Sequence, residues 1–350
     1  MIRLPVLLVF LLALIGLASA APAVIPRASP FQQQQLACNG HPSLCSKSVT
    51  DVTFAGTHNS YSTGSMNPGT NQFTGITTQL QYGIRLINLD IHNWKDDLYL
   101  CHKFCWALSR GRAVDSLREI AAFMNSAEGS REVITIIFEN AAKAGYDRLE
   151  KLLRDAGLAQ LAYVQPSSSK TWPTLGSMID SGKRLIVFAD ELPAPPANRP
   201  LPLVMSHFDY LSETPYSIRT ESDWTCSLDR PRGVARPLVL VNHWLYASAL
   251  GVDLPSANNA KKVNTASKLR EHVSKCRNIR GQRINYILVD FYEYGDITEV
   301  VAGLNNVPFV PKTRPPTQFR LFSNDKSTLM QSPYVQGLLS QKKPSAGLEM

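Results

Sequence analysis

Eight short apolar runs recur along this chain, and they constrain its fold more than any other feature of the sequence. The runs are rich in Val, Ile and Leu and are bounded by polar residues, Gly or Pro. Apolar runs without strict alternation are typical of parallel strands that are covered on both faces. We therefore expect strands at 52–54, 84–91, 98–101, 133–138, 184–188, 201–205, 238–241 and 286–291.

Helical patterns lie between several of these runs. Apolar residues recur every three or four positions within 114–124, 146–153 and 263–273, which is the spacing of one helix face. The chain has 350 residues, 44% of them hydrophobic, enough for one large core. Strands that alternate with helices predict an α/β fold, and eight strands favour a single (β/α)8 barrel of the TIM type. A doubly wound sheet is the alternative, but no Gly-rich phosphate loop follows the first strand.

The first twenty residues have the pattern of a secretory signal peptide. Arg3 precedes an apolar stretch at 5–18, and small residues at 18–20 form a cleavage site. The stretch is too short to span a membrane, and no later segment is apolar enough, so we expect a secreted, extracellular protein without a transmembrane segment. The expected organisation is a signal peptide at 1–20, a flexible lead-in at 21–37, one barrel domain at 38–320 and a C-terminal tail at 321–350.

The six cysteines point to disulfide bonds, because the secretory route is oxidising. Sequence alone leaves many connectivities open. Pairing of near neighbours favours Cys38 with Cys45, Cys101 with Cys105, and Cys226 with Cys276. A zinc site at 101–105 is the weaker interpretation, since no second closely spaced cysteine pair accompanies it.

The charge of the chain favours anionic partners. Lys and Arg number 36 against 28 Asp and Glu, a formal net charge of +8. Phosphate esters and acidic lipid surfaces fit this balance. The basic residues are scattered without a long cluster, so we expect no nucleic-acid partner. We also expect a monomer.

Polar residues stand at the ends of the predicted strands. In a (β/α)8 barrel the reacting groups gather at the C-terminal ends of the strands. His58 follows the first strand, and the next ones reach Asp90, His102 and Glu139. Strand alternation places Asn88 and His92 on the same face as Asp90. Three polar side chains on one face would be unfavourable in an apolar core, so we expect that face to meet a wet or ionic site.

Four motifs in these positions carry a family resemblance. They are GTHNSY at 56–61, NLDIHN at 88–93, LCHKFC at 100–105 and VITIIFEN at 133–140. Together they resemble the X-box core of the phosphatidylinositol-specific phospholipase C superfamily, and in particular its secreted, single-domain PLC-like phosphodiesterases. The resemblance is strongest over 51–190. It implies a phosphoric diester hydrolase that acts on a phosphoinositide-like or related phosphodiester, or on a phospholipid headgroup.

The resemblance also implies roles for two histidines. His58 matches the general base, which takes a proton from the attacking hydroxyl of the substrate. His102 matches the general acid, which protonates the leaving oxygen. Imidazole suits both tasks, because its pKa lies near the working pH.

Calcium-dependent members of the superfamily hold a metal ion near these histidines. The matching residues here are Asn59, Asp90 and Glu139, so we expect Ca²⁺, with Mg²⁺ as the second candidate. The family often has Glu-x-Asp on the second strand, whereas this chain has Asn88 two residues before Asp90. The loss of one carboxylate weakens a site for a hard cation.

Further polar residues are candidates for contact with the substrate. The expected substrate-binding residues are Asn88, His92, His243 and Asp290. For Asp290 the resemblance also implies that it orients the base histidine. His41, His207 and His272 have no companions in sequence, and we expect them at the surface or in loops.

Two other functions stay open. Because Asn88 replaces a carboxylate, the barrel could be catalytically weak or inactive and serve as a binding or structural protein. Within the enzymes, a sphingomyelinase D-like protein or a glycerophosphodiester phosphodiesterase is the near neighbour. Any peripheral membrane contact would come from loops, with Phe73, Trp94, Trp106 and Trp244 as candidate anchors.

Overall fold

The computed structural model describes residues 36–64, 69–102, 104–166, 171–195, 200–249 and 252–317. The predicted signal peptide at 1–20, most of the lead-in and the predicted tail at 321–350 lie outside the described residues.

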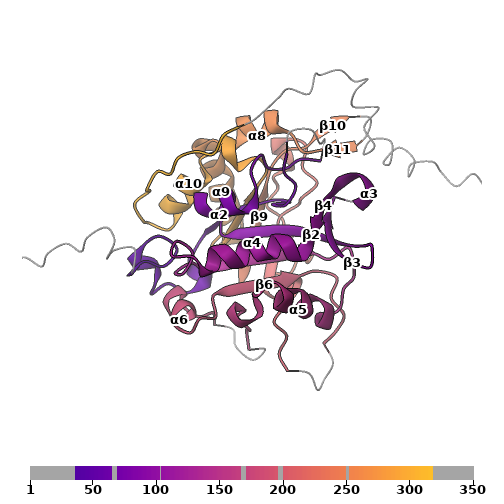
Figure 1. Cartoon of the computed structure of the whole chain (residues 1–350). Helices are drawn as coiled ribbons and strands as arrows, with labels where there is room; N and C mark the ends of the chain where they lie inside the picture. The colour runs from indigo at the N-terminus through magenta and orange to yellow at the C-terminus, as the bar shows by residue number, and fades with distance from the viewer. Residues whose placement is uncertain are drawn as a thin grey trace, which may run out of the picture.

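Eight parallel strands form one curled sheet, which confirms the predicted α/β barrel (Figure 1). Along the sheet their order is β7-β6-β5-β2-β1-β12-β9-β8. In the described part of the chain no ladder joins β7 to β8, and the short helix α7 (His207–Tyr210) connects them. The strands are β1 (Phe54–Thr57), β2 (Leu86–Trp94), β5 (Ile134–Glu139), β6 (Leu185–Ala189), β7 (Met205–Ser206), β8 (Leu211–Glu213), β9 (Leu238–His243) and β12 (Tyr286–Val289).

The predicted third barrel strand at 98–101 is wrong. These residues belong to β3 (Asp97–Cys101), which pairs antiparallel with β2 on one side and with β4 (Ser109–Arg112) on the other. Lys95 and Asp96 both have positive φ, the conformation of a two-residue hairpin turn. Such a turn leaves no chain for the crossover that a parallel strand needs. The missing barrel strand is β8, and of the strand predicted at 201–205 only its end enters β7.

Alternate residues of the barrel strands form two separate cores. Leu86, Ile137, Leu240 and Leu288 point into the barrel, and their neighbours along each strand pack against helices. Gly56 lies on the inner face, where an added Cβ atom would come within 2.9 Å of the Leu86 side chain. The barrel interior therefore requires glycine just before the first predicted catalytic residue.

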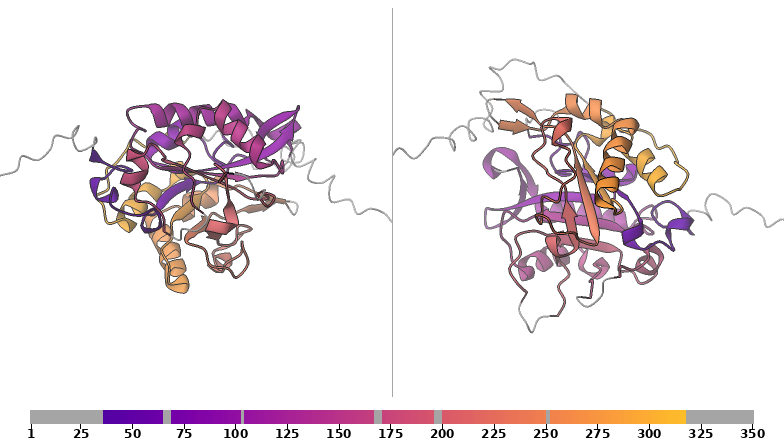
Figure 2. Two further views of the ribbon diagram at one scale, coloured as in Figure 1. Left: turned by 90° about the horizontal axis from the view of Figure 1, so that it is seen from below. Right: turned by 180° about the vertical axis from the view of Figure 1, so that it is seen from behind.

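Helices cover opposite sides of the sheet, with α4 and α5 on one side and α8 to α10 on the other (Figure 2). The apolar stripes predicted at 114–124 and 146–153 are buried. The stripe at 263–273 is divided between two helices, because Thr265 caps the second one through the Lys268 N–H. The helices are α2 (Ile76–Tyr82), α3 (Cys105–Leu108), α4 (Ala113–Asn125), α5 (Tyr146–Asp155), α6 (Leu175–Asp180), α8 (Ala257–Val263), α9 (Ala266–Arg280) and α10 (Ile297–Leu304). A small hairpin of β10 (Ala247–Ala249) and β11 (Val252–Leu254) follows β9.

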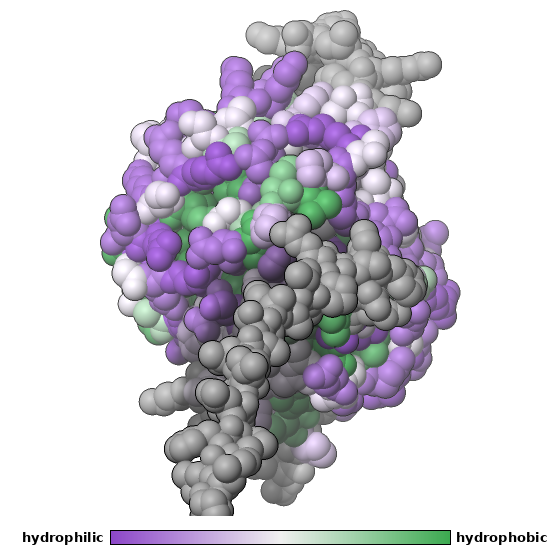
Figure 3. Space-filling view, turned by 90° about the vertical axis from the view of Figure 1, so that its left-hand side faces the viewer, coloured by the Kyte–Doolittle hydropathy of each residue, from purple (hydrophilic) through white to green (hydrophobic). Residues whose placement is uncertain are grey.

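The three expected disulfides are present, and they join Cys38 to Cys45, Cys101 to Cys105, and Cys226 to Cys276. Within the described residues no helix has the length and apolar character to cross a membrane. The face drawn in Figure 3 is largely hydrophilic, and its apolar side chains show only in small separate groups.

Candidate active site

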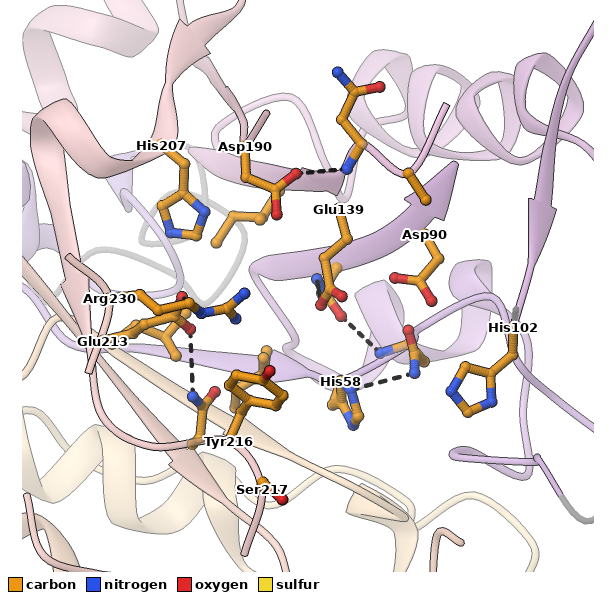
Figure 4. A pocket seen from close by; sticks show the side chains of 18 of the residues that line it. His58, Asp90, His102, Glu139, Asp190, His207, Glu213, Tyr216, Ser217 and Arg230 are labelled. Atoms are coloured by element: carbon orange, nitrogen blue, oxygen red, sulfur yellow. Dashed lines mark hydrogen bonds and ion pairs between the residues drawn. The ribbon is translucent and has the colours of Figure 1, made fainter. Parts of the chain in front are cut away.

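A cavity of about 510 Å³ opens at the C-terminal ends of the barrel strands (Figure 4). Its floor includes Ile137, Leu240 and Leu288 from the inner face of the barrel. Most of the predicted site residues line it, namely His58, Asn59, Asn88, Asp90, His92, His102 and Glu139. They come together because the ends of parallel strands meet at one rim.

His58 is held by an aspartate from the other end of the chain. Its Nδ1 lies 2.9 Å from Asp290 Oδ1, which also accepts a hydrogen bond from Asn71 Nδ2 at 2.8 Å. A carboxylate only accepts, so Nδ1 carries the proton and Nε2 is left with its lone pair. Asn59 Nδ2 donates to that Nε2 at 3.2 Å. Burial lowers the pKa of His58, but the charge and hydrogen bond of Asp290 outweigh burial and leave it raised.

The turn after β1 is fixed by Asn88 of β2. Asn59 has a left-handed backbone with φ 44°, which asparagine tolerates better than most residues. Its N–H donates to Asn88 Oδ1 at 2.9 Å, and the Ser60 N–H donates to the Asn88 carbonyl at 2.9 Å. Asn88 Nδ2 in turn donates to Glu139 Oε1 at 3.0 Å. The side chain of Asn88 therefore joins the turn after β1 to the end of β5.

His102 reaches the same cavity from the β3–β4 hairpin rather than from a barrel strand. The Cys101–Cys105 disulfide closes the chain around it. Figure 4 shows its ring beside His58 and below Asp90. The predicted pair of histidines thus shares one cavity, although for a different reason than the sequence indicated.

Two carboxylates and an amide group meet next to His58. Asp90 Oδ1 and Asn59 Oδ1 are buried and accept no hydrogen bond within the described part of the chain. Burial and the charge of Glu139 raise the pKa of Asp90 well above its usual value. Asp90 Oδ2 accepts a hydrogen bond from Tyr61 Oη at 3.3 Å. This cluster therefore concentrates negative charge and unsatisfied oxygen atoms.

The far half of the cavity contains residues that the sequence did not single out. Arg230 Nε lies 2.8 Å from Glu213 Oε1, and its guanidinium lies 4.4 Å above the Tyr216 ring. Figure 4 shows this guanidinium extending toward Glu139 and Asp190. Burial raises the pKa of Asp190 to about 6 and that of Glu213 to about 7. Glu213 lies on β8, whose three residues are too short a run to be recognised as a strand.

Comparison with known proteins identifies the family. Residues 44–305 match the family described as PI-PLC X 1. The chain belongs to the PI-PLC X domain family. A PI-PLC X domain-containing protein 1 of the fungus Arthroderma benhamiae is 31% identical over 284 residues, which are 78% of this chain and 91% of that protein.

Other relatives of this X domain are more distant. An uncharacterized secreted protein of Arthroderma benhamiae is 28% identical over 78% of this chain and 64% of its own length. A PI-PLC X domain-containing protein of Arabidopsis thaliana is 27% identical over 72% of this chain and 61% of its own length. The phosphatidylinositol-specific phospholipase C of Listeria monocytogenes has a TM-score of 0.51 and 16% identity, and the match covers 80% of this chain and 99% of that one. At this identity the likeness shows a shared fold.

The oxygen cluster of this X domain has the chemistry of a hard-cation site. Ca²⁺ and Mg²⁺ prefer carboxylate and amide oxygens, which Asn59, Asp90 and Glu139 supply. A cation would satisfy the two buried Oδ1 atoms and remove the repulsion between the carboxylates. Asn88 Oδ1 already accepts the Asn59 N–H, which uses one of its two lone pairs.

His243 is not part of the cavity, which corrects its prediction as a substrate-binding residue. Strand alternation turns Asn242 inward and His243 outward. Its Nδ1 lies 2.9 Å from His272 Nδ1, and its Nε2 donates to the Val263 carbonyl at 3.0 Å. Both rings stack on Trp224, so His272 is buried rather than at the surface. Burial lowers the pKa of His243 to about 4 and that of His272 to about 2.

The prediction that His207 lies at the surface or in a loop is also wrong. It lies buried in the wall of the cavity, and burial lowers its pKa to about 3. His92 does lie at the cavity, where burial lowers its pKa too.

Of the four aromatic candidates for membrane contact, Trp106 is the most exposed, at 58%. Phe73 packs on Phe291, and Trp244 is buried in the wall of the cavity.

Proposed function

We propose that this X domain is a secreted phosphoric diester hydrolase of the phospholipase C type. The observation that carries the proposal is His58, whose Nδ1 is bound to Asp290 while its Nε2 faces a cavity that it shares with His102. A histidine oriented by a carboxylate, with the other ring nitrogen toward an open site, has the arrangement of a general base.

The proposed reaction proceeds by transfer of two protons. His58 Nε2 takes the proton of a substrate hydroxyl as that oxygen bonds to phosphorus, and Asp290 stabilises the imidazolium that forms. The bond from phosphorus to the leaving oxygen breaks, and His102 donates a proton to that oxygen. When the hydroxyl belongs to the headgroup, the product is a cyclic phosphodiester.

Asn59, Asp90 and Glu139 would hold Ca²⁺, with Mg²⁺ as the second candidate. Such an ion, when bound, supplies positive charge to the phosphate oxygens. Asn88 positions two of these ligand residues, since its side chain forms hydrogen bonds with both Asn59 and Glu139.

A phosphoinositide-like headgroup suits the far half of the cavity. The guanidinium of Arg230 and the carboxylate of Asp190 offer donors and acceptors to a ring of hydroxyl groups. The bacterial protein that shares this fold is named as phosphatidylinositol-specific, which supports the same class of substrate. Secretion is supported by the signal-peptide pattern, the three disulfides and the relative named as a secreted protein.

The test is an assay of the full chain on phosphatidylinositol, glycerophosphodiesters and sphingomyelin. Replacement of His58 or His102 by Ala should lower turnover by about 10²–10⁴-fold, the usual contribution of a general acid or base. His41→Ala is the matched control, because His41 lies away from the cavity. Turnover that survives both cavity replacements would overturn the mechanism. Release of choline from sphingomyelin would favour the sphingomyelinase D-like alternative, and binding without cleavage would favour a binding protein.

A further inference from the structure

The ring of His58 is stacked on an indole. The centroids of His58 and Trp244 lie 4.1 Å apart, and the two ring planes differ by only 6°. Both residues are buried, at 7% and 2% exposure. Trp244 is itself anchored, because its Nε1 donates to the Tyr216 carbonyl at 3.1 Å. The imidazole therefore lies on a rigid aromatic surface.

Strand register explains how these residues meet. Thr57 of β1 pairs with Val289 of β12, and Val289 pairs with His243 of β9. The next residues along these three adjacent strands are His58, Asp290 and Trp244. The sheet thus brings the histidine, its carboxylate and its aromatic surface to the same level of the barrel rim.

The ring of His58 is constrained from three directions. Asp290 holds the Nδ1 edge at 2.9 Å, Asn59 contacts the Nε2 edge at 3.2 Å, and Trp244 covers one face. The two hydrogen bonds fix the edges of the ring in its plane. A parallel stack opposes rotation of that plane, which edge contacts restrain less.

We propose that Trp244 is a positioning residue for His58, which fixes the imidazole plane with Nε2 toward the cavity. This inference rests on the proposed function, since it assigns Trp244 a role in proton transfer by His58. A base held in line with the attacking hydroxyl avoids the large losses in rate that small displacements cause.

Two substitutions separate stacking from the hydrogen bond. Trp244→Phe and Trp244→Met both lose the N–H that reaches the Tyr216 carbonyl, but only Trp244→Phe keeps an aromatic face. Trp172→Phe is the control, because Trp172 is also a buried tryptophan but does not line the cavity. The first measurement is the NMR spectrum of the His58 ring at a single pH, assigned by its loss in His58→Ala. The second is the separate determination of kcat and KM.

We expect Trp244→Met to lower kcat by about tenfold or more with a smaller change in KM, because small displacements of a base reduce the rate. The ring signals of His58 should broaden or divide in this variant, since the plane of the ring is no longer held. Trp244→Phe should keep most of both properties. Equal kcat values and equal His58 signals in the Phe and Met variants would overturn the inference.

The two readouts distinguish this inference from the proposed function. The NMR spectra need no turnover, so a chain without phosphodiesterase activity would overturn the proposed function while the His58 signals still test the stack. An active enzyme whose His58 signals and kcat are the same in Trp244→Met and Trp244→Phe would overturn this inference alone.

Discussion

His58 Nδ1 and Asp290 Oδ1 lie 2.9 Å apart, although 232 residues separate them in the chain. The contact exists because β1 and β12 are neighbours in the sheet and end at the same level. It fixes the tautomer of the imidazole and leaves Nε2 unprotonated. The proposed chemistry therefore depends on the pairing of the first and last barrel strands.

Asp290→Asn should impair this base while leaving the fold intact. The amide keeps the size of the side chain but removes the charge that raises the pKa of His58. The base is active when neutral, so kcat/KM rises with pH through the pKa of His58, which Asp290 raises in the wild type. In Asp290→Asn we expect the rising limb of the kcat/KM profile to move to lower pH. The plateau of kcat/KM should fall by about 10²–10⁴-fold.

The exposed Asp115 provides a matched control for this change as Asp115→Asn. A limb that stays in place or moves to higher pH in Asp290→Asn would contradict the role assigned to Asp290. Thermal unfolding of both variants checks that the fold is retained.

Calcium should stabilise the wild-type chain. An ion bound only to the folded state adds about 2.7 kcal/mol at a concentration of 100 times Kd. The pKa of Asp90 is raised, so its carboxylate forms only at higher pH, and the calcium effect should grow as pH rises. Asp90→Asn and Glu139→Gln should abolish it.

Thermal unfolding with Ca²⁺, with Mg²⁺ and with a chelator measures this effect. Asp97→Asn is the control, because Asp97 is half exposed and paired with Arg112 on the hairpin. An equal shift of the melting temperature in Asp90→Asn and the wild type would place the ion elsewhere.

Arg230→Lys should weaken substrate binding more than the chemical step. Lysine keeps the charge near Glu213 but loses the planar fork and the stack on Tyr216. Loss of hydrogen bonds to a charged group predicts a KM about 10- to 100-fold higher on phosphatidylinositol. The exposed Arg219→Lys is the matched control. A fall in kcat with unchanged KM would instead place Arg230 at the reacting phosphate.

Acid should destabilise the fold through the pair of His243 and His272. Their pKa values are lowered to about 4 and about 2, so between these values and about 6.5 the unfolded chain binds more protons than the folded one. Stability is therefore lost as pH falls through this range. His243 alone contributes a loss of about 2 kcal/mol between pH of about 7 and about 4.5.

Urea unfolding at the two pH values tests this expectation with His272→Phe. The variant should lose about half as much stability on acidification as the wild type. Glu213, whose raised pKa acts with the opposite sign, is present in both proteins, so the difference isolates the histidine pair. An unchanged acid dependence in His272→Phe would contradict it, and His41→Gln serves as the control.

Patterns along single strands predicted much of the site. The alternation of β2 predicted that Asn88, Asp90 and His92 share a face, and all three line the cavity. The pattern also predicted that strand ends bring His58 and Glu139 to the same rim. Such inferences succeed because the period of a strand depends only on local backbone geometry.

Sequence patterns gave wrong predictions where the position of a residue depends on how its strand pairs with other strands. The run at 98–101 has the composition of a barrel strand, but the tight turn at Lys95 and Asp96 folds it back on β2. His243 was predicted to bind the substrate, but its register on β9 turns it outward. Strand β8 was too short to leave a pattern, so Glu213 and the nearby Arg230 were missed.

By itself, the sequence determined the class of fold and the residues available for chemistry, because composition and local periodicity encode these. Only the tertiary structure decided which of them meet. The register of β1, β12 and β9 places Asp290 and Trp244 around His58, and a hairpin rather than a barrel strand delivers His102. Contacts between distant segments depend on how strands pair, and no local pattern contains that information.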